Sequence, residues 1–234
     1  MTALTKSQHG RRVRSMFGEI AGKYDLINRL MTFGQDRVWR QCVVRAAGIP
    51  KSGSLLDAGA GTGAIALDAL KADTTLNVVA VDFTVKMMLM GRRKQNGSRL
   101  TWAAADALAL PFEDACFDAV TSGYLIRNVN DARQAFTEQA RVVKPGGRVV
   151  CLETSPPPKG LLRPILLLFL NRLIPLIGQI VSGNRPAYTY LPQTTQNFLS
   201  PQKVAATMRS AGLTNIRYQR FMFGTIAVHV SVRP

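Results

Sequence analysis

The sequence has few of the residues that hold metals or form cross-links. Its 234 residues include three cysteines and two histidines. Cys42, Cys116 and Cys151 are odd in number and lie in apolar segments, so we expect buried, reduced thiols instead of a disulfide framework. His9 and His229 lie far apart with no cysteine cluster beside either, which is not the ligand spacing of a zinc site. We therefore expect no metal.

Acidic and aromatic residues are also scarce. The chain has 14 Asp and Glu against 30 Lys and Arg, a formal net charge of +16, and its aromatic content is 7%. A basic surface attracts nucleic acid or anionic lipid headgroups, and it can also be an ordinary solvated surface. Because aromatic side chains do not interleave with the basic ones, stacking platforms for bases are not evident. Nucleic acid is therefore the least favoured of these partners.

The chain lacks a long uninterrupted apolar run. The longest apolar stretch, residues 161–181, contains arginines and two prolines, so the sequence predicts no transmembrane helix. The first 17 residues are polar and basic and lack the apolar core of a signal peptide. We expect a cytoplasmic protein, and the basic charge allows a peripheral position on the inner face of the membrane.

What the chain does contain is a regular alternation of strand-like and helix-like segments. The pattern predicts strands at 54–57, 77–82, 100–106, 117–123, 148–154, 216–223 and 225–233, and helices near 36–47, 63–71, 84–95, 131–143 and 201–211. The first five strands are apolar at consecutive positions, as parallel strands covered on both faces are. We expect an α/β fold with a doubly wound, seven-stranded, mostly parallel Rossmann-like sheet that ends in an antiparallel hairpin.

The most informative motif follows the first predicted strand. Gly59, Gly61 and Gly63 form a loop, and Asp82 ends the next strand. A dinucleotide site has the spacing G-x-G-x-x-G and faces a pyrophosphate, whereas here the spacing is G-x-G-x-G and Asp57 precedes it. A carboxylate there would repel a pyrophosphate but suits a cation. The loop therefore predicts a site for S-adenosylmethionine, and the alternative is a strand-turn-helix of another α/β protein.

Further candidates lie at the ends of other strands. Asp106 and Ala107 would face the adenine amino group, although Asp106 could equally cap a turn. Phe83 could pack on the adenine ring or belong to the core. Gly123 ends the fourth strand, where a sulfonium and its methyl group need close backbone.

Arg127 and Asn128 leave the fourth strand among apolar neighbours. Together they could hold an oxyanion on a methyl acceptor. The alternative is structural, with Arg127 paired to Asp131 and Asn128 capping the next helix.

Two longer segments resemble signatures of the ubiquinone/menaquinone biosynthesis C-methyltransferase family, which belongs to the class I S-adenosylmethionine-dependent methyltransferases. Residues 24–39 are similar to Y-D-x-M-N…S-x-x-x-H-x-x-W, and residues 141–155 match the second signature throughout. Residues 117–129 are similar to F-D…G-L-R-N-V, and 190–198 resemble a late acceptor-side segment. The resemblance covers about residue 11 to the C-terminus, and residues 151–155 look closer to the menaquinone branch, that of demethylmenaquinone methyltransferase.

The resemblance implies roles for individual residues. Arg127 and Asn128 match the pair thought to position the quinol and a water. The chain departs from the signatures at Asp36, where the family has His, at Thr32, where it has Ser, and at Gly123, where many members have Ser. The candidate cofactor-binding residues are Asp57, Gly59, Gly61, Thr62, Gly63, Asp82, Phe83, Asp106, Ala107 and Gly123, and the candidate catalytic residues are Arg127 and Asn128.

The implied reaction is C-methylation of a prenylated quinol, from demethylmenaquinol to menaquinol, with S-adenosylmethionine as donor and no metal. The alternatives are another small aromatic acceptor, a nucleic-acid methyltransferase, or a protein that binds the donor without catalysis. A prenyl tail needs an apolar cover, and residues 161–181 suit an interfacial segment that contacts the membrane. The alternatives for this segment are a buried lid or a contact in a homodimer.

We expect a single methyltransferase domain in four parts. Residues 1–47 form a helical cap on the acceptor side, and residues 48–155 form the donor-binding core. Residues 156–200 form an apolar lid or insertion, and residues 201–234 form the last helix and the hairpin.

Overall fold

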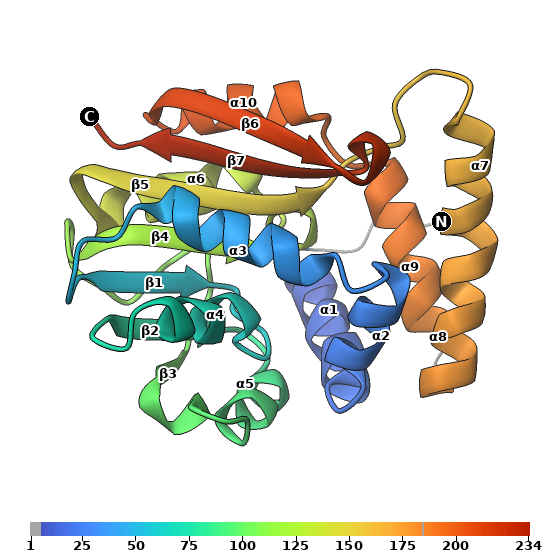
Figure 1. The fold of residues 1–234 in the computed structure, drawn as a ribbon, viewed down its shortest axis with the longest axis horizontal. Helices are drawn as coiled ribbons and strands as arrows, with labels where there is room; N and C mark the ends of the chain where they lie inside the picture. The colour runs from blue at the N-terminus through green and yellow to red at the C-terminus, as the bar shows by residue number, and fades with distance from the viewer. Residues whose placement is uncertain (1–5, 184) are drawn as a thin grey trace.

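Seven strands form one sheet in the order β3-β2-β1-β4-β5-β7-β6 (Figure 1). The structure is a computed structural model that describes residues 6–183 and 185–234. The strands are β1 Ser54–Ala58, β2 Asn77–Asp82, β3 Thr101–Ala104, β4 Phe117–Gly123, β5 Val143–Thr154, β6 Thr214–Phe221 and β7 Ile226–Val232. Strands β1 to β5 run parallel to one another, while β7 is antiparallel to both β5 and β6. This confirms the predicted parallel sheet with a final antiparallel hairpin.

Helices cover both faces of this sheet. They are α1 Lys6–Ile20, α2 Tyr24–Met31, α3 Asp36–Ala47, α4 Ala64–Ala72, α5 Val85–Arg92, α6 Ala132–Val142, α7 Arg163–Leu168, α8 Ile174–Ser182, α9 Arg185–Gln196 and α10 Pro201–Ser210. Short 3₁₀ turns are η1 Gly97–Arg99, η2 Ile126–Asn128 and η4 Met222–Gly224, and η3 Phe169–Leu173 is a π-helix. In Figure 1, α3 and α4 lie in front of the sheet, and α6 and α10 lie behind it.

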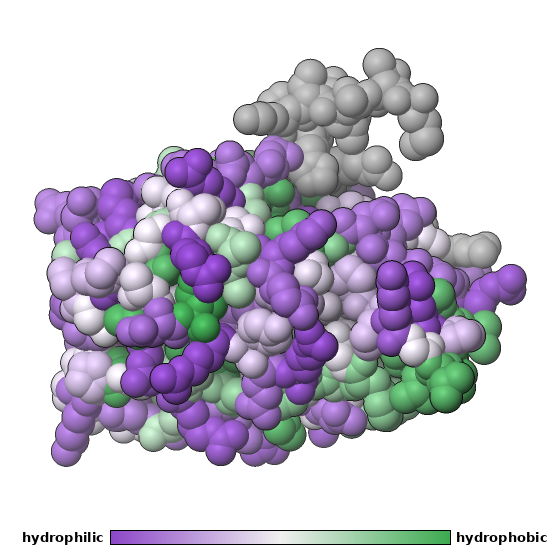
Figure 2. Space-filling view, turned by 90° about the horizontal axis from the view of Figure 1, so that it is seen from above, coloured by the Kyte–Doolittle hydropathy of each residue, from purple (hydrophilic) through white to green (hydrophobic). Residues whose placement is uncertain are grey.

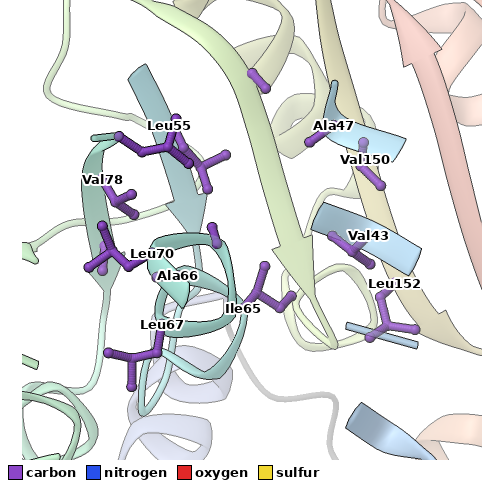
Figure 3. Close-up of a cluster of buried hydrophobic side chains, with 14 of the residues drawn as sticks. Val43, Ala47, Leu55, Ile65, Ala66, Leu67, Leu70, Val78, Val150 and Leu152 are labelled. Carbon is purple, nitrogen blue, oxygen red and sulfur yellow. The ribbon is translucent and has the colours of Figure 1, made fainter. Parts of the chain in front are cut away.

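The central strands are apolar at consecutive positions because each face of the sheet has its own core. Leu55 and Leu56 are neighbours in β1, point to opposite faces and are fully buried. On the front face, Val43 of α3 lies over Leu152 of β5 (Figure 3). Burying one such side chain contributes roughly 1.5–3 kcal/mol, so this two-sided burial holds the strand register.

A smaller group of helices gathers beyond the carboxyl ends of the parallel strands. Figure 1 shows α1, α2, α8 and α9 together at this end of the sheet. They share a separate apolar cluster that includes Ile27 of α2, Leu170 of η3 and Ile174 of α8. Segments from the N-terminus and from residues 163–196 therefore build one cap over the strand ends.

The segment 161–181, for which the sequence predicted no transmembrane helix, is almost entirely helical. Helices α7, η3 and α8 follow one another without a gap. Pro164 lies in the first turn of α7, where a missing N–H is tolerated. Pro175 lies inside the continuous run, where its missing N–H removes one helical hydrogen bond, and the π-helical turn η3 directly precedes it. By length and composition alone, Arg163–Val181 could cross a membrane, and 22% of it is buried in the protein.

Strand β5 begins five residues before the predicted strand at 148–154, so residues 145–147 lie inside it. β5 already begins at Val143, which pairs with Phe117, and pairing resumes with Arg148 opposite Ala119. The extra residues of β5 form a bulge with Gly146 at a φ of +77°.

Candidate active site

The carboxyl ends of the parallel strands border a cavity of about 390 Å³, which we call the strand-end cavity. Parallel strands all end at the same edge of a sheet, so residues distant in sequence meet there. Of the candidate cofactor-binding residues, those that line it are Gly59, Gly61, Asp82, Phe83, Asp106, Ala107 and Gly123. Asp57 and Thr62 instead line a neighbouring polar cavity of about 300 Å³, and Gly63 lines neither.

The loop after β1 brings bare backbone to the strand-end cavity. Gly59 and Gly61 have φ values of +68° and +56°, a region that costs little only for glycine. A Cβ on Gly59 would lie 2.7 Å from the Leu125 side chain. The N–H of Gly61 donates to Oδ2 of Asp82 over 2.8 Å, so the glycine loop and the end of β2 form one rim.

Asp82 is held firmly at this rim. Its Oδ1 accepts the N–H of Thr84 over 2.6 Å, while Oδ2 accepts that of Gly61. Burial raises the pKa of Asp82, and these backbone donors oppose that rise. Each carboxylate oxygen can accept more than one hydrogen bond, so Asp82 can also hold the hydroxyls of a ribose. The bare glycine backbone and this carboxylate fit a nucleoside.

Asp57 is satisfied inside the protein. It is 1% exposed, and its carboxylate accepts the Thr121 hydroxyl over 3.0 Å and the Ala66 N–H over 3.2 Å. Burial raises its pKa to about 7. A carboxyl that is only partly ionised near neutral pH attracts a cation less strongly than a fully charged carboxylate, which the prediction from the sequence had assumed. Its bonds tie β1 to β4 and to the first turn of α4, so Asp57 supports the loop from within.

Thr62 connects the glycine loop to the helical cap. Its hydroxyl donates to Oδ1 of Asp25 in α2 over 2.7 Å. Lys94 Nζ lies 2.5 Å from Oδ2 of the same carboxylate and donates to the Thr62 carbonyl over 3.0 Å. Sequence reasoning missed Asp25 and Lys94 as site residues, because only the tertiary fold brings them to the loop.

The adenine-side candidates lie along the strand-end cavity. Phe83 is 44% exposed, and Cζ of Arg14 lies 5.3 Å from its ring centroid. Asp106 Oδ1 accepts the Leu108 N–H over 2.9 Å, so the turn-capping alternative is realised. Asp106 nevertheless borders the cavity together with the buried Ala107.

A third, apolar cavity of about 100 Å³ lies within the helical cap. Its walls come from α1, α2, α8, α9, η3 and the end of β5. Representative lining residues are Phe17, Met31, Leu170, Ile174, Tyr188 and Leu191. Arg127 is the one charged residue among the described residues that line this cavity.

Arg127 has a partner that sequence reasoning did not anticipate. It forms an ion pair with Glu153 at the end of β5, and the two side chains are 6% and 1% exposed. Glu153 also accepts the N–H of Arg127 over 3.3 Å and that of Thr154 over 2.7 Å. Burial acts to lower the pKa of Arg127, but Glu153, together with Tyr24 and Tyr124, outweighs it and the pKa is raised. Nε of Arg127 is buried without a hydrogen-bond partner in the described structure.

The structural alternatives considered for Arg127 and Asn128 are wrong. Asp131 does not pair with Arg127; its carboxylate caps α6 by accepting the Gln134 N–H over 2.9 Å. Asn128 does not cap that helix. It donates through Nδ2 to the Tyr124 carbonyl over 2.7 Å and accepts the Tyr190 hydroxyl over 3.2 Å. Asn128 therefore stands between the strand-end cavity and the helical cap.

The departure at Asp36 is accommodated by an ionic network. Thr32 donates its hydroxyl to Oδ1 of Asp36 over 3.2 Å at the start of α3. Arg40 forms ion pairs with Asp36 and with Asp68 of α4, the latter over 2.7 Å. These residues, Thr32 apart, border the polar cavity, so the change of residue type at position 36 lies near the site.

No group of three or more potential metal ligands occurs in residues 6–183 and 185–234. His229 is buried in β7, where burial lowers its pKa and its Nε2 lies 2.9 Å from the Pro201 carbonyl. The side chain of His9 lies outside the described part of the chain. Cys151 is buried as expected, whereas Cys42 and Cys116 are partly exposed, and all three are free thiols.

The sheet order, the glycine loop and the acidic strand end define the class I methyltransferase fold. Solved structures with this fold include the [4+2]-cyclase SpnF, with a TM-score of 0.71 at 15% identity over 100% of this chain and 98% of that one. A methyltransferase from Thermotoga maritima has a TM-score of 0.66 at 18% identity over 94% and 99%.

The chain belongs to the ubiE/COQ5 methyltransferase family, whose model matches residues 4–233. It is 42% identical to the ubiquinone/menaquinone biosynthesis C-methyltransferase UbiE of Desulfotalea psychrophila, over 96% of this chain and 91% of the relative. It is also 42% identical to the demethylmenaquinone methyltransferase of Thermus thermophilus, over 94% and 100%. The protein is an enzyme that uses S-adenosylmethionine as methyl donor.

Proposed function

We propose that this protein C-methylates a prenylated quinol and converts demethylmenaquinol to menaquinol. The observation that carries the proposal is the pair of adjoining cavities. A strand-end cavity with a carboxylate and bare glycine backbone suits the donor, and an apolar cavity beside it contains one buried arginine. The names of the relatives point to the same acceptor class.

In the strand-end cavity, we assign Asp82 to the ribose hydroxyls and Asp106 with Ala107 to the adenine. Phe83 would lie against the adenine ring, and Gly123 would leave room beside the methyl group. Thr62 and Asp57 would act by holding the loop, because their polar atoms are bonded to protein groups.

The donor, when bound, supplies a methyl group whose C–S bond breaks with its electron pair left on sulfur, while a quinol ring carbon forms the new C–C bond and then loses its proton. Arg127 would stabilise the quinol oxygen through its unpartnered Nε–H. Arg127 stays protonated, so the ring proton would leave through water held by Asn128. Glu153 would keep the guanidinium in place.

Residues 161–181 would let the enzyme reach a prenyl tail in the membrane. Apolar side chains gather at the end of the molecule that carries α7 and α8 (Figure 2). Ile165 and Ile180 are 63% and 74% exposed, Arg163 follows the exposed Leu162, and Arg172 precedes the exposed Leu173. An apolar stripe with basic neighbours suits an anionic membrane surface. We therefore place the enzyme on the cytoplasmic face of the membrane.

Labelled S-adenosylmethionine tests the acceptor. The protein is incubated with chemically reduced membrane extract from a strain blocked in this step, and the labelled product is identified by mass. Label in menaquinone is expected. Label in RNA, in another aromatic compound or in no quinone would refute the proposal.

Two alanine variants test the division between the cavities. Arg127→Ala should keep affinity for S-adenosylmethionine and lose turnover, whereas Asp82→Ala should weaken donor binding first. Calorimetry with the donor, beside initial rates, separates the two effects. Loss of donor binding in Arg127→Ala would show that the acceptor site is misplaced.

Co-sedimentation with phosphatidylglycerol vesicles tests the membrane surface. Ile165→Ser combined with Ile180→Ser should release most of the bound protein. The matched control is Leu89→Ser, because Leu89 is 48% exposed on α5. Equal binding of both variants would exclude α7 and α8 as the contact, and a loss of dimer in sedimentation would assign them to a second copy instead.

A further inference from the structure

Two tyrosines stand where the three cavities meet. Of all the described residues, only Tyr24 and Tyr124 line the strand-end, the polar and the apolar cavity together. A methyl group that passes from a donor in the first to an acceptor in the last must cross this junction. The two rings come from separate parts of the fold, because Tyr24 begins α2 and Tyr124 follows β4.

Tyr124 is held in a costly backbone conformation. Its φ is +57°, which for a bulky residue costs on the order of 1–3 kcal/mol. The surroundings enforce it: the Tyr124 N–H donates to the Leu152 carbonyl over 2.8 Å, and the Tyr124 carbonyl accepts from Asn128. Such strain persists where the ring position matters, and it is concentrated at functional sites.

One ring at the junction already contacts a cation, because Cζ of Arg127 lies 5.1 Å from the Tyr124 ring centroid, which is within cation–π distance. Glu153 neutralises that guanidinium, so it would repel a second cation only weakly. Burial raises the pKa of both Tyr24 and Tyr124, so their hydroxyls stay protonated and neither phenol serves as a base near neutral pH.

We propose that the ring faces of Tyr24 and Tyr124 contact and hold the sulfonium of S-adenosylmethionine at the passage into the apolar cavity. The inference rests on the proposed function for the direction of transfer, but its recognition step concerns the donor alone. A sulfonium is a cation that an aromatic face attracts. The product S-adenosylhomocysteine is a neutral thioether of almost the same shape, so the rings would favour donor over product.

The ratio of affinities for these two ligands tests the proposal. In calorimetry, Tyr124→Leu and Tyr24→Leu should each weaken S-adenosylmethionine binding roughly 3- to 30-fold. Binding of S-adenosylhomocysteine should change less than about twofold. Tyr124→Phe and Tyr24→Phe keep the ring, so they should have the same ratio of affinities for the two ligands as the wild type. Phe83→Leu is the matched control, since Phe83 lines only the strand-end cavity, and it should weaken both ligands by the same factor.

Equal losses for both ligands in the leucine variants would overturn the proposal, because packing alone does not distinguish a sulfonium from a thioether. If strain makes Tyr124→Leu unfold, Tyr24→Leu carries the test, since Tyr24 lies in an ordinary helix. The measurement uses no acceptor. A wrong assignment of the quinol would therefore leave this result unchanged, and the two failures can be told apart.

Discussion

Removing Glu153 alone should destabilise the protein strongly. Glu153 and Arg127 are both buried, so Glu153→Leu leaves an arginine charge without its partner. Breaking such a pair costs about 3–5 kcal/mol. For a chain of 234 residues, each kcal/mol lowers the melting temperature by about 2–4 °C. The expected fall is therefore roughly 6–20 °C.

Replacing both partners should recover most of this loss. In Arg127→Met with Glu153→Leu, no charge is buried and apolar side chains of similar volume fill the space, which is often neutral for stability. The double variant should melt within about 4 °C of the wild type, bind S-adenosylmethionine and have no turnover. Stability and activity would then be separated at one site.

Calorimetric melting of the wild type and of the single and double variants provides the assay. If Glu153→Leu has the same melting temperature as the wild type, the Arg127 charge is not buried and the reasoning is refuted. If the double variant melts as low as the single one, the loss comes from the bonds of Glu153 to the Arg127 and Thr154 N–H groups. Urea titration should give the same order.

Three further predictions concern the loop and the cap. Burial raises the pKa of Asp57 from 3.8 to about 7 in the folded state, so the free energy of unfolding should fall as pH rises through that range. In urea titrations at about pH 5 and 8, Asp57→Asn should reduce the difference between the two free energies of unfolding. An unchanged difference would contradict this. Asp25→Asn should shift melting by less than about 4 °C, because its pair with Lys94 is partly exposed, but should weaken donor binding in calorimetry; unaltered binding would show that the link to α2 is not needed. Gly178→Ala places a Cβ 2.1 Å from the Tyr188 ring and should raise KM for the quinol without changing donor affinity; a change in donor affinity instead would place this contact outside the apolar cavity.

Local sequence patterns were sufficient to predict the part of the site that binds the methyl donor. Gly59, Gly61 and Asp82 lie within consecutive strand-loop units, and their spacing alone places them at one sheet edge. The same patterns could not show that the Asp57 carboxyl is only partly ionised, because that depends on burial by β4 and α4. They also could not find Asp25, whose contact with the loop depends on how the cap folds back.

The sequence by itself determined the sheet, the glycine loop and the candidate residues, because strand periodicity and turn chemistry act over a few neighbouring residues. Tertiary structure alone decided that Arg127 pairs with Glu153, that residues 163–182 form one helical run, and that Tyr24 and Tyr124 line the same cavity. Those outcomes depend on which distant segments share a low-dielectric interior. A buried charge or ring takes its partner from three-dimensional proximity, which spacing along the chain does not encode.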